Sequence, residues 1–257
     1  MPMNEQRIPQ LVAHRGYMHQ YPENTWSALE AALQAGACWL EFDVQMCADG
    51  QFVLLHDADC NRTGDDPRSV FDTDSQTLQR VSVHEPDRFG DRFFPEAVPD
   101  LATVLQRLAS FPNARAMVEI KDESLDRWGM EKVMDALLKT LIPFQRQCIL
   151  IAYSDAALDF AQQQGDMVTG WVVRSYDRQH LERASQLGPQ FLICNERKIP
   201  PGETPWRGGW QWMLYDISDP DTALQWSARG VALIETRDIK AMLEDPLLAS
   251  QACRHGI

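Results

Sequence analysis

Two acidic residues, Glu41 and Asp43, stand two positions apart in the otherwise apolar segment WLEFDVQ, residues 39–45. Side chains alternate between the two faces of a β-strand, so both carboxylates would share one face with Trp39 and Gln45, and the other face would carry Leu40, Phe42 and Val44. A strand of a half-solvated antiparallel sheet shows the same alternation without any functional role. The pattern therefore indicates a functional site only if other segments of the chain place further reactive side chains beside these carboxylates.

A second segment, AMVEIK at residues 116–121, repeats this arrangement, with Glu119 and Lys121 on one face of the predicted strand. Three carboxylates and a lysine would then converge, and buried charges of this kind require partners. Oxygen ligands without histidine or cysteine at metal-binding spacing favour a hard divalent cation, Mg²⁺ or Ca²⁺. We therefore expect Glu41, Asp43 and Glu119 to bind one such ion. A salt bridge between Lys121 and one of the acids is the alternative interpretation.

Two histidines stand at the ends of predicted strands. The segment LVAHRGY places His14 and Arg15 at the end of the first strand, and LLHD places His56 at the end of the strand that follows the acids. Histidine exchanges protons readily near neutral pH, which suits it to general acid and base catalysis. We predict that His14 and His56 transfer protons and that Arg15 and Lys121 bind an anion.

Short apolar strands at regular spacing must position these residues. Helical patterns follow several of the strands, which predicts parallel pairing, because parallel strands need a crossover connection. Eight such units in 257 residues predict a (β/α)₈ TIM barrel, one domain over residues 1–257, with its active site at the C-terminal ends of the strands. The eight segments are LVAH at 11, WLEFDVQ at 39, AMVEIK at 116, CILIAY at 148, MVTGWVV at 167, QFLICN at 190, WQWMLY at 210 and VALIET at 231.

Two segments depart from this regular alternation. An insertion at about residues 47–99, between the second strand and the second helix, carries an extra strand at 52–56, and we expect it to lie over the barrel mouth. Residues 196–209 hold too many prolines and glycines for a normal helix, so the sixth helix should be short or missing. Single residues mark predicted helix ends: Gly36 ends the first helix, and Asp100 and Asp219 begin two later ones.

The composition argues against several classes of protein. A formal net charge of −13 disfavours nucleic acid and anionic membranes as partners. The N-terminus MPMNEQRIPQ has no apolar run typical of a signal peptide, and no later segment has the roughly 18 to 20 apolar residues of a membrane span. We therefore expect a cytoplasmic protein without stable membrane association. Its six scattered cysteines lack the spacing of a zinc site or a disulfide scaffold, so we expect free thiols.

The segments that carry these residues resemble the glycerophosphodiester phosphodiesterases. The resemblance rests on AHRGYMHQYPENTWSALEAALQAG, LEFDVQMCADGQFVLLHDADCNRTG, VPDLATVLQRL and VEIK, and it is looser toward the C-terminus. It implies a barrel hydrolase in which Glu41, Asp43 and Glu119 bind the metal, His14 and His56 act as acid and base, and Arg15 and Lys121 contact phosphate. Within the PENT signature, either Asn24 or Thr25 is expected to cap the first helix, with Glu23 near the site.

The chain departs from the family pattern on its seventh and eighth strands. The family has Trp followed by Thr-Val-Asn on the seventh strand, where this chain has Trp212 followed by MLY. The Thr-Asp that ends the eighth strand in the family is Thr236-Arg237 here, preceded by Glu235. These strands wall the pocket of the family, so the resemblance implies that Trp212 contacts substrate and that alcohol specificity differs from the family pattern.

We therefore predict a metal-dependent phosphodiesterase that hydrolyses a small-molecule glycerophosphodiester to glycerol 3-phosphate and an alcohol. One alternative is a lysophospholipase D, which needs an apolar groove that Phe89, Phe93 and Phe94 of the insertion could supply. Another is a catalytically silent phosphodiester-binding barrel, which would not need the histidine pair. Because no serine, threonine or cysteine stands at a matching strand end, the nucleophile would be water or the substrate's own C2 hydroxyl.

Overall fold

The computed structural model describes residues 7–254 of the chain. Residues 1–6 and 255–257 lie outside this range. The prediction that the N-terminal segment is not a signal peptide therefore falls partly outside the described residues. Within the described part of the chain, no helix is both long enough and apolar enough to cross a membrane.

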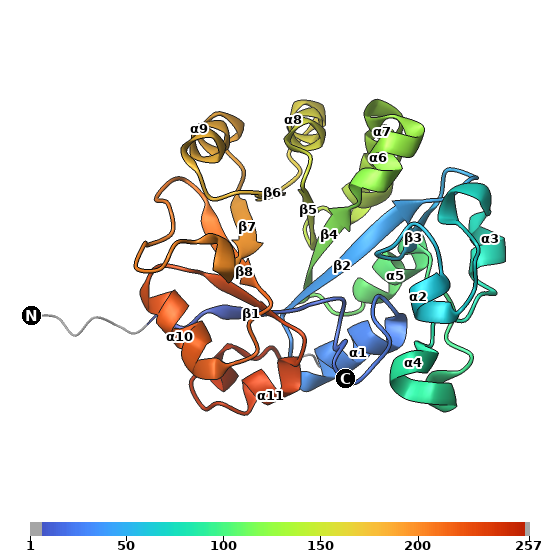
Figure 1. Cartoon of the computed structure of the whole chain (residues 1–257), viewed down its shortest axis with the longest axis horizontal. Helices are drawn as coiled ribbons and strands as arrows, with labels where there is room; N and C mark the ends of the chain where they lie inside the picture. Colours follow the sequence, from blue (N-terminus) through green and yellow to red (C-terminus); the bar gives the residue numbers. More distant parts are fainter. Residues whose placement is uncertain (1–6, 255–257) are drawn as a thin grey trace, which may run out of the picture.

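Eight parallel strands close into a barrel in the described residues (Figure 1). The first strand pairs with both the second and the last, so the sheet has no free edge between them. The predicted TIM barrel is therefore confirmed. Its strands are β1 (Gln10–Ala13), β2 (Trp39–Met46), β4 (Arg115–Ile120), β5 (Cys148–Ala152), β6 (Thr169–Val172), β7 (Phe191–Asn195), β8 (Gln211–Tyr215) and β9 (Leu233–Thr236).

Helices surround this barrel and connect most of its strands (Figure 1). The segment after β7 holds only the 3₁₀ turn η4 (Glu196–Lys198), which confirms that the sixth helix is missing. The surrounding helices are α1 (Trp26–Ala35), α5 (Leu101–Leu108), α6 (Asp122–Trp128), α7 (Met130–Leu141), α8 (Asp155–Gln164), α9 (Arg178–Leu187), α10 (Pro220–Ala228) and α11 (Ile239–Leu243), with further 3₁₀ turns η3 (Ile142–Phe144) and η5 (Leu248–Gln251).

The predicted helix ends are formed by local hydrogen bonds. Asp100 and Asp219 cap α5 and α10, because each side chain accepts a hydrogen bond from a backbone N–H in the first turn. Thr25 caps α1 in the same way. Gly36 ends that helix in the left-handed conformation, with φ of 105°, which glycine adopts without steric cost.

The two faces of the strands pack into different parts of the core. On β2, Phe42 and Val44 belong to the large cluster that packs against the helices. On β4, Met117 belongs to a second cluster inside the barrel, built from alternate residues of the other strands. The period of two therefore divides each strand between helix-facing and barrel-facing side chains, as predicted.

The insertion between β2 and α5 has a small core of its own, formed mainly by valines, leucines and cysteines. Its first strand pairs with β2 in antiparallel orientation and so lies outside the barrel proper. Figure 1 shows the insertion gathered beside β2, in cyan to green colours. Its elements are β3 (Phe52–Leu54), α2 (Asn61–Gly64), η1 (Val70–Asp72), α3 (Ser75–Leu78), α4 (Pro86–Phe89) and η2 (Gly90–Phe93).

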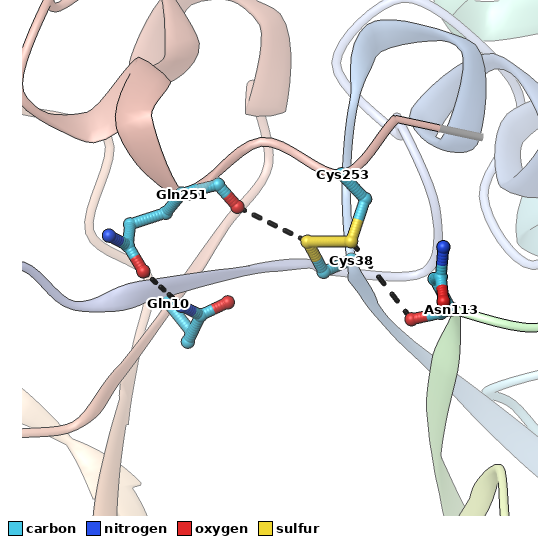
Figure 2. Close-up of a disulfide and its surroundings, with 5 residues drawn as sticks. All are labelled: Gln10, Cys38, Asn113, Gln251 and Cys253. Atoms are coloured by element: carbon cyan, nitrogen blue, oxygen red, sulfur yellow. Dashed lines mark hydrogen bonds between the residues drawn. A yellow bond between two sulfur atoms is a disulfide. The ribbon is translucent and has the colours of Figure 1, made fainter.

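A disulfide joins Cys38, just before β2, to Cys253 near the C-terminus (Figure 2). The expectation of six free thiols is therefore wrong for these two residues, although the other four cysteines are free and buried. The pair is 215 residues apart, so only the return of the C-terminal segment to the base of β2 brings the two Cα atoms within 5.1 Å. Beside it, the Gln10 side chain donates a hydrogen bond to that of Gln251.

Candidate active site

A cavity of about 150 Å³ opens at the C-terminal ends of the barrel strands. Its polar wall comes mainly from β1, β2, β4 and β9, and its apolar wall comes from β5 to β8. Seven of the eight side chains predicted to form the site line this cavity: His14, Arg15, Glu41, Asp43, His56, Glu119 and Lys121.

A tight turn after β1 holds the beginning of the site. Arg15 adopts a left-handed conformation with φ of 51°, which aims its backbone N–H at Glu41 Oε2, 3.0 Å away. Gly16 follows with φ of 78°, and a Cβ at this position would lie 2.5 Å from the carbonyl carbon of Ala28. The turn therefore requires glycine, because helix α1 packs directly against its backbone.

Three carboxylates converge at the base of the cavity. Glu41 and Asp43 are each 2% exposed, and one oxygen each of Glu41, Asp43 and Glu119 lies within 4.8 Å of the others. Burial and the neighbouring Asp43 charge raise the pKa of Glu41 well above its usual value, and the same two causes raise the pKa of Glu119. The ionised forms of Glu41 and Glu119 are therefore unfavourable without a partner, and a divalent cation bound to the three carboxylates would stabilise them.

Two positively charged side chains already contact two of these three carboxylates. Arg15 Nε lies 3.0 Å from Asp43 Oδ2, and Lys121 Nζ lies 2.8 Å from Glu119 Oε1 and 3.4 Å from Asp43 Oδ1. Burial alone would raise the pKa of Asp43, but the charges of Arg15 and Lys121 hold it below its usual value. The salt bridge that is the alternative to metal binding is therefore present, but within residues 7–254 no lysine or arginine side chain pairs with Glu41.

Asn24 orients Asp43, a role that no sequence pattern indicated. Its side-chain amide donates to Asp43 Oδ2 at 3.0 Å, and its Oδ1 accepts a hydrogen bond from the backbone N–H of Asp43 at 3.1 Å. Of the two candidates for the α1 cap, Thr25 is the cap. Asn24 instead adopts a φ of 56°, which asparagine tolerates better than most residues.

A chain of hydrogen bonds holds His56 at the edge of the cavity. Its Nδ1 lies 2.7 Å from Asp57 Oδ1, and Asp57 Oδ2 accepts a hydrogen bond from Arg62 Nε at 2.7 Å. Arg62 also donates to Glu23, which in turn accepts a hydrogen bond from Arg15. The carboxylate of Asp57 favours the tautomer with a proton on Nδ1, which leaves the lone pair of His56 on Nε2.

His14 lies deeper, between two carboxylates. Its Nε2 is 3.9 Å from Glu41 Oε2 and 3.9 Å from Glu235 Oε2, and its buried Nδ1 has no hydrogen-bond partner among the described residues. Burial and the charge of Arg15 lower the pKa of His14 to about 4. The imidazole is therefore neutral near pH 7.

Trp212, the eighth predicted residue, lies outside the cavity. It is 3% exposed, belongs to the helix-facing core and donates its indole N–H to the Trp206 carbonyl oxygen at 2.8 Å. Its neighbours Met213 and Tyr215 line the cavity instead, because alternate residues of β8 face opposite sides. The position of Trp212 therefore argues against the substrate contact that the family resemblance implies.

Three further cavity residues were not assigned roles from the sequence. Glu235, on β9, is 4% exposed, and burial followed by the Glu119 charge raises its pKa well above the usual value. Tyr153 and Tyr215 extend from β5 and β8, and their hydroxyl groups meet 3.3 Å apart. The period of two would have found Glu235 and Tyr215, since both share the inward parity of their strands.

Comparisons with solved structures show the same fold. A phosphodiesterase from Oleispira antarctica, solved in complex with its product sn-glycerol-3-phosphate, has a TM-score of 0.79 at 22% identity, covering 92% of this chain and 96% of that one. A putative glycerophosphoryl diester phosphodiesterase from Silicibacter pomeroyi has a TM-score of 0.80 at 19% identity, covering 96% of this chain and 95% of that one.

Curated relatives match at the sequence level. A glycerophosphodiester phosphodiesterase from Caldanaerobacter subterraneus subsp. tengcongensis is 28% identical, with 58% of this chain and 59% of the relative covered. One from Bacillus altitudinis is 32% identical, with 49% of this chain and 50% of the relative covered. The match thus spans about half to three fifths of the length of these relatives. The Glycerophosphoryl diester phosphodiesterase family matches residues 14–180, more than half of the chain, and the chain belongs to that family.

Proposed function

We propose that this protein is a metal-dependent phosphodiesterase that hydrolyses a small-molecule glycerophosphodiester to glycerol 3-phosphate and an alcohol. The observation that carries the proposal is the meeting of Glu41, Asp43 and Glu119 with His14 and His56 in one cavity. Family membership and the fold of the Oleispira antarctica enzyme, which was solved with this product, support the same activity.

Glu41, Asp43 and Glu119 would hold one divalent cation, Mg²⁺ or Ca²⁺, because all three offer carboxylate oxygens. When bound, the cation would supply positive charge that offsets the charge developing on the phosphate in the transition state. Asn24 holds Asp43 in its orientation, and the Arg15 backbone N–H does the same for Glu41.

The histidines would exchange the two protons that the reaction requires. One histidine takes the proton of the attacking group, which is water or the substrate's C2 hydroxyl, and the other gives a proton to the departing alcohol. If the C2 hydroxyl attacks, the product is a cyclic phosphate, and a water molecule then opens it to glycerol 3-phosphate. His56 is oriented for this by Asp57, and His14 is the neutral imidazole that follows β1. Arg15 and Lys121 line the same cavity and would contact the phosphate oxygens.

The alternative of a lysophospholipase D finds less support. Phe89, Phe93 and Phe94 do not line the cavity, since Phe93 packs against Tyr21 and Phe89, and Phe94 packs against His84. The cavity of about 150 Å³ suits a small diester better than an acyl chain. The alternative of a silent binding barrel does not account for His56 and Asp57, since binding alone needs no oriented proton carrier.

The cytoplasmic location stays a prediction. The Cys38–Cys253 disulfide counts against it, because reducing compartments keep most thiols reduced.

Metal removal tests the proposal most directly. We expect EDTA to abolish hydrolysis of glycerophosphocholine and added Mg²⁺ or Ca²⁺ to restore it. Glu41→Ala, Asp43→Ala and Glu119→Ala should each weaken metal binding by at least about 10-fold in calorimetry, since each loses an oxygen ligand. Glu182→Ala, at an exposed position of α9, is the matched control. Full activity without metal, or undiminished metal binding in all three variants, would contradict the proposal.

The roles of the histidines need a separate measurement. His14→Ala and His56→Ala should each lower kcat by about 10² to 10⁴-fold while the protein still binds metal. Activity on lysophosphatidylcholine is measured beside activity on glycerophosphocholine. A higher rate on the lysolipid would favour the lysophospholipase D, and unchanged kcat in both variants would remove the histidines from catalysis.

A further inference from the structure

Glu235 is a buried carboxylate for which the proposed reaction has no use. Only 5% of its side chain is exposed, and its carboxylate makes no hydrogen bond within residues 7–254. It lines the reaction cavity from β9, beside β1, and its nearest positively ionisable partner is the His14 imidazole at 3.9 Å. A buried carboxylate without hydrogen bonds is costly, so its presence calls for a ligand.

The atoms around Glu235 are spaced as ligands of an ion rather than as hydrogen-bond partners. His14 Nε2 lies 3.9 Å from an oxygen of Glu41 and 3.9 Å from an oxygen of Glu235, too far for hydrogen bonds. An ion about 2.1 Å from each of two donors can join donors up to about 4.2 Å apart. All three donor atoms lie within 4.8 Å of one another, so shifts of a few tenths of an ångström in these side chains would let them surround one ion.

We propose that His14, Glu41 and Glu235 form a second cation site that selects an imidazole-binding metal such as Zn²⁺. A ligand set of one imidazole and two carboxylates suits Zn²⁺, whereas Mg²⁺ and Ca²⁺ prefer oxygen ligands alone. Glu41 belongs both to this group and to the group with Asp43 and Glu119, so its two carboxylate oxygens can serve both sites. The inference rests on the proposed function for the identity of that first site.

Occupation of the second site would inhibit the enzyme. An ion bound to His14 Nε2 engages the lone pair that the histidine needs to take up a proton, so His14 could no longer act as acid or base. Mg²⁺ at the first site would leave this nitrogen free. The enzyme should therefore be active with Mg²⁺ and lose activity when Zn²⁺ is added.

The test counts bound ions and measures inhibition. Metal-free wild-type protein equilibrated with excess Mg²⁺ and one equivalent of Zn²⁺ should bind one Mg²⁺ and one Zn²⁺ per chain by elemental analysis, and Glu235→Gln should bind Mg²⁺ alone. The Zn²⁺ concentration that halves Mg²⁺-dependent activity should rise at least about 10-fold in Glu235→Gln, because a ligand is lost. Asp216→Asn is the matched control: it removes another cavity carboxylate outside the three-residue group and should still bind two ions.

Failure of this inference is distinct from failure of the proposed function. Failure of the wild-type chain to bind Zn²⁺ beside Mg²⁺, or equal Zn²⁺ inhibition of wild type and Glu235→Gln, overturns the second site and leaves the Mg²⁺-dependent activity intact. Full activity without any metal overturns the proposed function instead. Counting the ions bound by wild type needs no variant, so this measurement tests the second cation site even if Glu235→Gln does not fold.

Discussion

Breaking the Cys38–Cys253 disulfide should lower the free energy of unfolding by about 2 to 5 kcal/mol. The disulfide joins residues 215 apart, so it restricts the unfolded chain over most of its length. In the chain-entropy model a loop of about 100 residues contributes about 4.7 kcal/mol, and the contribution grows only slowly with length. About 5 kcal/mol is therefore an upper value for the contribution of this disulfide to the free energy of unfolding, and measured contributions are often smaller.

Urea denaturation followed by circular dichroism, with and without dithiothreitol, measures this effect. With an m-value of about 3 kcal/mol/M, a loss of about 3 kcal/mol lowers the midpoint by about 1 M urea. Cys38→Ser is the matched control, since it removes the disulfide and should make the midpoint insensitive to dithiothreitol. The four remaining cysteines are buried and free, so the reductant has no other target among the described residues.

Two results would refute this reasoning. Equal midpoints with and without dithiothreitol would mean that the disulfide contributes nothing to stability. Titration of six free thiols in denatured protein that has never met a reductant would mean that the disulfide does not form. We expect four free thiols in that sample and six after reduction.

Three further predictions test the site and its support. Asp57→Asn should lower kcat by about 10 to 100-fold with metal affinity unchanged, because His56 loses the carboxylate that orients it; an unchanged kcat would leave Asp57 with a structural role only. A substrate without the C2 hydroxyl should bind with a similar Kd and react at least about 10²-fold more slowly if that hydroxyl is the nucleophile, whereas comparable turnover would favour water. Gly16→Ala should lower the free energy of unfolding by about 1 to 3 kcal/mol, because the φ of 78° is strained for alanine and the new Cβ would clash with the Ala28 backbone. An unchanged urea midpoint would contradict this.

Much of the fold and part of the site follow from local rules that the sequence alone carries. Alternation at period two predicts that Glu41 and Asp43 face the barrel interior, and both line the cavity. Capping side chains predict where helices begin, as Asp100 does for α5. Such rules involve residues only a few positions apart, so neighbours in the chain are enough to apply them.

Other features depend on residues that are far apart in the chain, and only the closed barrel decided them. The Cys38–Cys253 disulfide forms because the C-terminal segment returns to the base of β2, and no cysteine spacing indicates that return. Glu235 lies beside His14 because β9 pairs with β1 across the closure of the sheet. Trp212 faces the helices because its strand enters the barrel with Met213 pointing inward. Sequence periodicity shows which residues share a face of a strand, but the register and closure of the sheet determine which faces meet.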